Sequence, residues 1–379
     1  METITQARNG VEVAELIKEL NRRKETARDI VTPAHVARMT DTGAMIVDNI
    51  RDAAVALPMS KTAHGQTAAH LNIPLAYYNR MREAQPGLLA ANVNTWMAEQ
   101  KGNRMFRLLD NGIRANVSDR YRALDSYDLA FATLGVVNQV ADETGQRPQV
   151  TKATLTDDRF EMRIIHPAWE TDLEYPANGI DRQYGADGGH RISRPAVGKI
   201  IPGVYVSNSE TGQGGLNVKP FLLDMICTNG MIGEEAFSRV HLGSRQEAGY
   251  LSAETRDTQD RLLWMQITDL IRSVFDKDRF QILIDTLKGA VAAELAAPIE
   301  AVDAVVKQYE MSEDDKQAIL NELISPSHDR DPGRTVFGLL SAITERAKAY
   351  EATDPERMTT LEEAGLDFAK NARQMVAVR

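Results

Sequence analysis

Residues 104–118 read "RMFRLLDNGIRANVS", two strand-like stretches that meet at Asn111–Gly112. Asn-Gly between two such stretches is the strongest short-range signal for a β-hairpin. A segment with helical spacing of apolar side chains follows, beginning at Asp125 or Ser126 and ending near Gly145. The sequence therefore predicts a hairpin followed directly by a helix.

A second hairpin follows this helix. Residues 149–167 ("QVTKATLTDDRFEMRIIHP") alternate around Asp157–Asp158, and two more strand-like stretches come at 203–210 and 216–227. The glycine-rich 210–215 ("ETGQGG") lacks the Lys and Ser or Thr of a nucleotide-binding loop and is typical of a hairpin loop. Together these segments predict an α+β fold, with an antiparallel sheet and packed helices, followed by a mostly helical C-terminal part.

Three parts of the chain differ in pattern. Residues 1–100 are mostly helical, 101–244 hold the α+β core with a basic stretch, and 245–379 form a helical, acidic C-terminal part. In this last part Gly, Pro and charged residues separate successive amphipathic segments. The last part of the chain, 351–379, is polar and charged, and we expect a tail that is mobile at its end.

Composition excludes several classes of protein. The chain has 379 residues, 43% of them apolar, which is enough for a sizeable core. No apolar run approaches the ~18 residues that a membrane span needs, and the N-terminus lacks the apolar centre of a signal peptide. One cysteine permits neither an intramolecular disulfide nor the usual thiolate zinc site. We expect a cytoplasmic protein without contact to a membrane.

Charge is distributed unevenly along the chain. The net charge is −10, yet residues 101–122 hold six cations against two carboxylates, a local balance of +4. Residues 294–379 hold 17 acidic and 10 basic side chains, a balance of −7. The basic stretch and the acidic end therefore belong to different parts of the molecule.

Residues 60–84 predict two short helices joined by a tight turn. Ser60 can cap the first helix, the break falls at Asn72–Pro74, and Pro74 is tolerated at the start of the second. Such a pair resembles a DNA-binding helix-turn-helix, but it is also a common packing unit. The apolar and aromatic start of the second helix favours packing.

The single cysteine, Cys227, has two interpretations. With His241 as base and Asn229 as orienting group it could serve as a nucleophile. The apolar run that precedes it favours a buried structural residue instead. No two of the seven histidines lie four residues apart and no HExxH occurs, so the sequence supports neither a metal site nor a cofactor.

The basic stretch is the candidate site for nucleic acid. Cations that contact phosphates, beside a ring on which a base can stack, hold single strands without reading their sequence. We expect Arg120 and Arg122 to share one face of a strand and Tyr121 to take the other. The alternative is that the arginines pair with Asp119 and Asp125 on a solvated sheet face. The candidate residues are Arg104, Arg107, Arg114, Arg120 and Arg122, with the Gly-rich loop residues His190, Arg191, Arg194 and Lys199.

Several short motifs form a recognisable series along the chain. They are Ser118, Arg120, Tyr121 and Asp125, then Asn208, Ser209 and Gly212, then Cys227, Asn229 and Gly230, with His241. This series resembles the phage- and plasmid-like proteins grouped as domain of unknown function 932. The resemblance covers roughly residues 40–245 and implies carriage by phages, prophages or conjugative elements in a bacterial host. It implies no reaction.

The leading hypothesis is a non-enzymatic protein that binds single-stranded DNA in phage recombination or annealing and assembles as a homo-oligomer. One alternative is an enzyme that uses Cys227 and His241 or a carboxylate-bound metal. Another is an assembly or counter-defence protein whose acidic helical part binds a host protein.

Overall fold

The computed structural model describes most of the chain. The described residues are 4–5, 10–47, 55–175, 196–224, 230–233, 237–239, 252–325, 334–351 and 353–378. Cys227, Asn229, His190, Arg191, Arg194 and His241 lie outside them. Among the described helices, none combines the length and the apolar character that a bilayer crossing requires.

The fold is α+β, as the sequence predicts, and its centre is a twisted antiparallel sheet. The described strands pair in the order β1-β8-β9-β11-β12-β13, while β10 pairs with β11 and β14 with β12. Both expected hairpins of this region, β8–β9 and β11–β12, are present. The strands are β1 (Ile4–Thr5), β8 (Gln149–Leu155), β9 (Phe160–Ile165), β10 (Thr171–Tyr175), β11 (Ala196–Asn208), β12 (Leu216–Asp224), β13 (Gly230–Ile232) and β14 (Phe237–Arg239).

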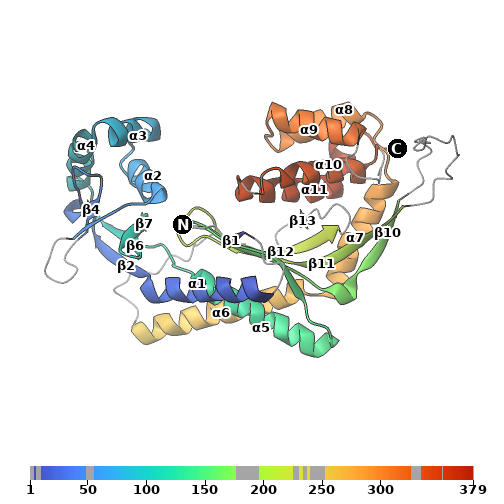
Figure 1. Cartoon of the computed structure of the whole chain (residues 1–379), viewed down its shortest axis with the longest axis horizontal. Coiled ribbons are helices and arrows are strands. Elements are labelled where there is room, and N and C mark those ends of the chain that lie inside the picture. The colour runs from blue at the N-terminus through green and yellow to red at the C-terminus, as the bar shows by residue number, and fades with distance from the viewer. Residues whose placement is uncertain are drawn as a thin grey trace.

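Three helices cover one face of this sheet: α1 (Gly10–Thr26), α5 (Ser126–Thr144) and α6 (Ala253–Val274). In Figure 1 they lie together below the strands. Leu16 of α1, Leu129 of α5 and Ile271 of α6 are buried in one core with Phe160 and Val204 of the sheet. The expected helix at 125–145 is confirmed, and Gly145 ends it in the left-handed conformation.

The C-terminal helices cover the other face, most of them above the strands in Figure 1 and the first of them beside the strands at the right. They are α7 (Lys277–Ala292), α8 (Pro298–Gln308), α9 (Glu313–Ile324), α10 (Val336–Lys348) and α11 (Pro355–Met375). The expectation that 351–379 is a tail, mobile at its end, is wrong, because Pro355–Met375 is a helix and Ala377 accepts a backbone hydrogen bond from Ala296. Leu361, Leu366 and Phe368 of α11 are buried in the core that these helices share with Leu222 of β12. The apolar side chains of α11 recur at helical spacing among polar residues, and their burial against the core holds the segment in place.

Residues 28–118 form a separate unit, here named the N-terminal lobe, at the left of Figure 1. It contains two three-stranded sheets, β2-β6-β7 and β3-β4-β5, and three helices. Its elements are β2 (Arg28–Pro33), the short helix at Ala34–Val36, β3 (Arg38–Met39), β4 (Met45–Ile46), β5 (Ala56–Leu57), α2 (Lys61–His70), α3 (Leu75–Ala84), α4 (Pro86–Ala98), β6 (Asn103–Leu109) and β7 (Gly112–Ser118).

The hairpin at 104–118 is confirmed, with two corrections. It pairs with β2 in the lobe and is not part of the central sheet, so a boundary at residue 100 divides the lobe. Its turn is centred one residue earlier than expected, because Leu109 pairs with Gly112. Asp110 and Asn111 both have positive φ, which Asp and Asn tolerate better than most residues.

Candidate functional site

Two arginines of the basic stretch are buried where the lobe meets the core. Arg107, which is 2% exposed, bonds Asp29 at 2.9 Å and the Glu210 carbonyl oxygen at 2.5 Å, and pairs with Asp125 at 3.3 Å. Arg114 pairs with a Glu210 carboxylate oxygen at 2.6 Å. Their charges are thus neutralised inside the protein, and placing them on an exposed strand-binding surface is wrong. Sequence proximity suggested Asp119 and Asp125 as partners: Asp125 forms an ion pair with Arg107, and Asp119 acts on Arg104 through its charge.

Glu210 is the centre of this contact. Its second carboxylate oxygen accepts the backbone N–H of Ser126 at 2.6 Å, the first residue of α5. Burial alone would raise the pKa of Glu210, but Arg114, the Ser126 N–H and Arg107 together hold it below the ordinary value. The side chain therefore stays charged and joins the lobe, the central sheet and α5. We name Arg107, Arg114 and Glu210 the Glu210 cluster.

The glycine-rich turn between β11 and β12 docks the lobe onto the core. Gln66 of α2 donates to the Thr211 carbonyl oxygen at 2.6 Å, and the Tyr121 hydroxyl donates to the Ser209 carbonyl oxygen at 3.0 Å. Gly212 has φ +77°, and a Cβ there would lie 3.3 Å from a Val117 methyl group. Positive φ and the close approach both require glycine. The interpretation of 210–215 as a hairpin loop is confirmed.

The remaining candidate cations are dispersed. Arg104 is partly buried against Asn116, Arg122 pairs with Asp260 of α6 at 2.5 Å, and Lys199 pairs with Glu170. Arg120 is exposed. Strand β7 ends at Ser118, so the expected alternation of residues 120–122 on two faces of a strand is wrong.

The helix pair α2–α3 carries the most distinctive exposed surface of the lobe. Ser60 caps α2 by accepting the Ala63 N–H at 3.0 Å, as the sequence predicts. Asn72 in the connecting turn has φ 55°, and Tyr78 behind the pair is buried with its hydroxyl 2.9 Å from His64 Nδ1. The cap, the turn and the buried tyrosine together hold two consecutive helices on a shared core.

The outer face of these helices is apolar and aromatic with cations beside it. Leu75 and Tyr77 at the start of α3 are 52% and 49% exposed, and Trp96 of α4 is also exposed. Arg80 is exposed one turn beyond Tyr77, on the same helix face. An exposed apolar group on an otherwise well-packed unit marks a contact surface.

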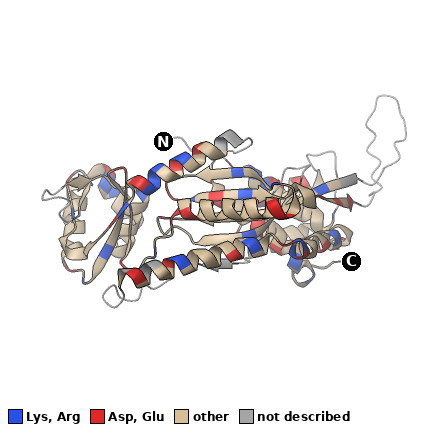
Figure 2. Cartoon of the chain, turned by 90° about the horizontal axis from the view of Figure 1, so that it is seen from below, with Lys and Arg blue, Asp and Glu red and all other residues tan. Residues whose placement is uncertain are grey.

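Net charge distinguishes the lobe from the rest of the chain. Residues 28–118 contain ten Lys and Arg against seven Asp and Glu, a balance of +3, which leaves −13 for the remainder. In Figure 2 basic residues lie on the lobe at the left, and basic and acidic residues alternate along the core helices. An anionic partner is therefore attracted to the lobe and repelled by the core.

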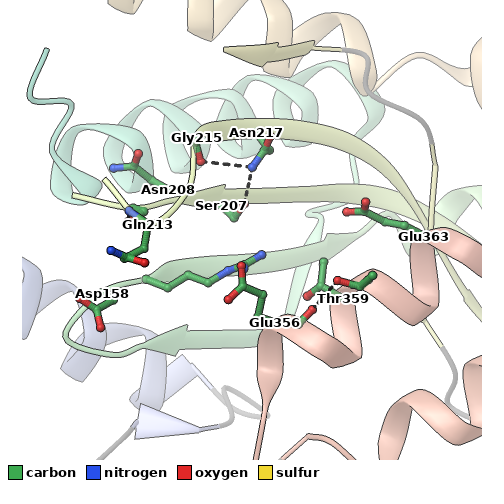
Figure 3. Close-up of a pocket in the computed structure, with 13 residues that line it drawn as sticks. Asp158, Ser207, Asn208, Gln213, Gly215, Asn217, Glu356, Thr359 and Glu363 are labelled. Atoms are coloured by element: carbon green, nitrogen blue, oxygen red, sulfur yellow. Dashed lines mark hydrogen bonds and ion pairs between the residues drawn. The ribbon is translucent and has the colours of Figure 1, made fainter. Parts of the chain in front are cut away.

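A polar pocket of about 230 Å³ lies between the sheet and α11. Glu356, Thr359 and Glu363 reach it from α11, across from Ser207 and Asn217 at the ends of β11 and β12 (Figure 3). Asn217 donates to the Ser207 hydroxyl at 3.1 Å and to the Gly215 carbonyl oxygen at 3.2 Å, which fixes this wall.

Arg159 provides the positive charge of the pocket. Its guanidinium donates to the Tyr205 hydroxyl at 2.9 Å and lies 3.7 Å from Glu161 and 3.6 Å from Glu356. Among described residues no group of three or more His, Cys, Asp and Glu could hold a metal ion. Neither the pocket nor the Glu210 cluster was predicted from sequence, because nothing local links residues 159, 210 and 356.

Comparison with known proteins gives no match: no family model fits the chain, and neither a curated protein nor a solved structure is significantly similar to it.

Proposed function

We propose that the chain is a nucleic-acid-binding protein that holds single-stranded DNA on its N-terminal lobe. The observation that carries the proposal is the exposed start of α3, where Tyr77 and Arg80 share one helix face and Leu75 is exposed two residues before Tyr77, on a lobe of net charge +3. Non-specific single-strand binding needs rings and apolar surface for the bases and cations for the phosphates. The acidic core repels the phosphates of the DNA strand, so the DNA is expected to lie on the lobe.

A duplex is the second candidate, and the α2–α3 geometry favours it. Two helices joined by a four-residue connection, Leu71–Pro74, have the form of a helix-turn-helix. However, Leu75, Ala76 and Tyr77 would face the groove first, and aliphatic side chains there read no hydrogen-bonding edge except by contact with a thymine methyl group. These side chains are better suited to contact the faces of unpaired bases than to read base edges in a duplex groove.

The candidate cations have different roles in this proposal. Arg120 and the partly buried Arg104 remain available to extend the phosphate path, whereas Arg107 and Arg114 support it from inside. A role in recombination or annealing, a phage or plasmid origin and assembly into a homo-oligomer belong to the same proposal. Exposed Leu262 and Met265, one turn apart on α6, offer an apolar surface for self-association.

A mobility-shift assay on mixed-sequence single- and double-stranded oligonucleotides, at low and at physiological salt, tests the proposal. We expect preferential binding of the single strand, weakening with salt. Tyr77→Ala should reduce affinity about tenfold, since stacking contributes about 1–3 kcal/mol per base. Arg147→Ala, at an exposed position of the core, is the matched control.

Two results would redirect the interpretation. Preference for the duplex that is lost with Tyr77→Ala would establish the second candidate. Absence of binding to either form would remove the proposal and leave the enzyme or the host-protein-binding hypothesis. In that case an activity abolished in a folded Cys227→Ala protein would support the enzyme.

A further inference from the structure

The pocket between the sheet and α11 has the composition of a small-molecule site. Three segments build it: the β8–β9 turn with Asp158 and Arg159, the ends of β11 and β12 with their connecting turn, and the first half of α11. Its volume of about 230 Å³ lies below the roughly 300–1,000 Å³ typical of drug-sized ligands. A ligand of this pocket is therefore small.

The walls of this pocket exclude several ligand classes. Among the described residues, every one that lines the pocket is polar, charged or glycine, and none is aromatic or aliphatic. A nucleobase would find no ring on which to stack, although flipped bases are normally held between aromatic or apolar groups. The apolar part of the pocket surface comes from carbon atoms of these polar side chains and of the glycines. A ligand that fits must therefore carry polar groups that pair with the ends of the side chains.

Charges of both signs face this space. Arg159 is the one cation among the lining residues, and Asp158, Glu356 and Glu363 supply three carboxylates. An inorganic anion would be repelled by the carboxylates, and a simple cation or polyamine would meet the guanidinium. A molecule with one positive and one negative end matches both.

Arg159 is placed to receive the negative end. A guanidinium has five N–H donors, and charge-assisted bonds between nitrogen and carboxylate oxygen measure about 2.7–2.9 Å. Its contact with Glu356 is 3.6 Å, and the Glu356 side chain is 70% exposed, so this pair is weak. Its Nε is buried and faces Glu161 at 3.7 Å, so the group open to a ligand is Nη1, which faces Glu356. A ligand carboxylate can displace Glu356 and accept from Nη1.

The carboxylates can receive the positive end. One oxygen of Asp158 accepts the Thr62 hydroxyl at 2.9 Å, and one oxygen of Glu363 accepts Lys219 Nζ at 2.8 Å. These bonds hold the two side chains in place, and each carboxylate has further acceptor positions for an ammonium group. The Ser207 hydroxyl oxygen and the Gln213 amide add neutral acceptors.

We propose that this pocket binds a small zwitterion, a free amino acid, with its carboxylate on Arg159 and its ammonium group among Asp158, Glu363 and the neighbouring hydroxyls. The proposal is independent of nucleic-acid binding by the lobe. The pocket and the α3 surface share no residue.

Thermal unfolding of the whole chain with each of the common amino acids at millimolar concentration tests this. We expect one amino acid, or a chemically related few, to raise Tm, and calorimetry to give saturable binding. The methyl ester of that amino acid, which lacks the carboxylate, and its N-acetyl form, which lacks the ammonium group, should both fail. Absence of a Tm shift with every amino acid overturns the proposal.

Two variants test whether the ligand binds in the pocket. Arg159→Gln should weaken binding at least about tenfold, as expected for loss of a charged hydrogen bond. Gly214→Phe should fill part of the pocket, and the position can carry a side chain because a Cβ at Gly214 meets only Ser209 Cβ at 3.7 Å. Arg147→Gln is the control and should bind as the wild type does. Unchanged affinity in a folded Gly214→Phe protein would place the ligand elsewhere and overturn the proposal.

Discussion

The guanidinium of Arg163 on β9 donates to both carboxylate oxygens of Glu362 on α11, at 2.7 and 2.6 Å. The two side chains are 4% and 1% exposed, and 199 residues separate them in sequence. Lys219–Glu363 and Lys152–Glu351 lie beside this pair. Helix α11 therefore meets the central sheet through a layer of ion pairs. This layer lies next to the apolar core that the C-terminal helices share.

Replacing Glu362 by Gln should lower the free energy of unfolding by about 3–5 kcal/mol, because the Arg163 charge would remain buried without its partner. The double change Arg163→Met with Glu362→Leu should cost less than the single one, since it removes both buried charges. Urea unfolding followed by circular dichroism measures both. A single variant as stable as the wild type would show that the layer contributes nothing.

Gly230 should tolerate no side chain, because the ion pair occupies its space. A Cβ at Gly230 would lie 2.5 Å from Glu362 Oε1 and 2.8 Å from Arg163 Nη1. We expect Gly230→Ala to destabilise the chain by about 1–3 kcal/mol, as overpacking of a well-filled site does. Gly135→Ala, where a Cβ meets nothing within 4 Å, is the matched control and should be neutral or slightly stabilising. Equal Tm values for the two variants would contradict this account.

Arg107 and Arg120 belong to the same basic stretch but should behave differently. Arg107→Ala leaves the Asp29 and Asp125 carboxylates and the Glu210 carbonyl without their donor, and should cost about 3 kcal/mol or more of stability. Arg120→Ala, at an exposed position, should change stability by less than about 0.5 kcal/mol. Thermal unfolding gives the comparison, and similar losses in both would show that Arg120 too is structural.

His64 should make the lobe less stable in mild acid. Burial, and secondarily Arg82, lowers the pKa of His64 from 6.5 to about 4, so the unfolded chain binds a proton more readily than the folded one. The associated stability is complete above about pH 6.5 and is lost as the pH falls towards 4. Between pH 7 and 5 this loss amounts to about 2 kcal/mol.

A His64→Gln variant provides the test of this pH dependence. It should start from a lower Tm at pH 7, because the contact with Tyr78 changes, but its Tm should fall less between pH 7 and 5. Parallel pH profiles for the variant and the wild type would show that His64 does not titrate with unfolding.

Single-strand binding should lose salt sensitivity together with affinity when Arg80 is removed. Each phosphate neutralised on a single strand contributes about 0.7 to the slope of log K against log salt. Arg80→Ala should therefore lower that slope by about 0.7, whereas Tyr77→Ala should weaken binding and leave the slope unchanged. An unchanged slope in Arg80→Ala would place the phosphate path elsewhere on the lobe.

Much of the fold could be predicted because its signals are local. Asn111 beside Asp110 and Gly112, the cap at Ser60 and the helix end at Gly145 each fix a neighbouring backbone conformation. The cap and the helix end are as expected, and the hairpin forms with its turn one residue earlier. The assignment of the first hairpin to the central sheet failed because pairing partners are distant. Nothing near residues 104–118 indicates that β6 pairs with β2, from Arg28 to Pro33.

The candidate site was harder to predict, because charge alone does not show where a side chain points. In the sequence Arg107, Arg114 and Arg120 look equivalent. Their environments differ because Glu210, about a hundred residues later, reaches the first two and not the third. Likewise α11 reads as a polar tail, since residues such as Glu362 are buried with partners that only the folded sheet supplies.

The position of α1 has a consequence for the order in which the protein folds on the ribosome. Leu16 and Leu20 belong to the core under the central sheet, yet the next residues to emerge, 28–118, belong to the lobe. The lobe is thus continuous in sequence and can fold as soon as β7 has left the exit tunnel. Helix α1 must wait for the strands that follow α5, and the opposite face of the sheet stays open until Phe368 is made. During that interval a finished lobe is tethered to an unfinished core, the stage at which a chaperone would be needed.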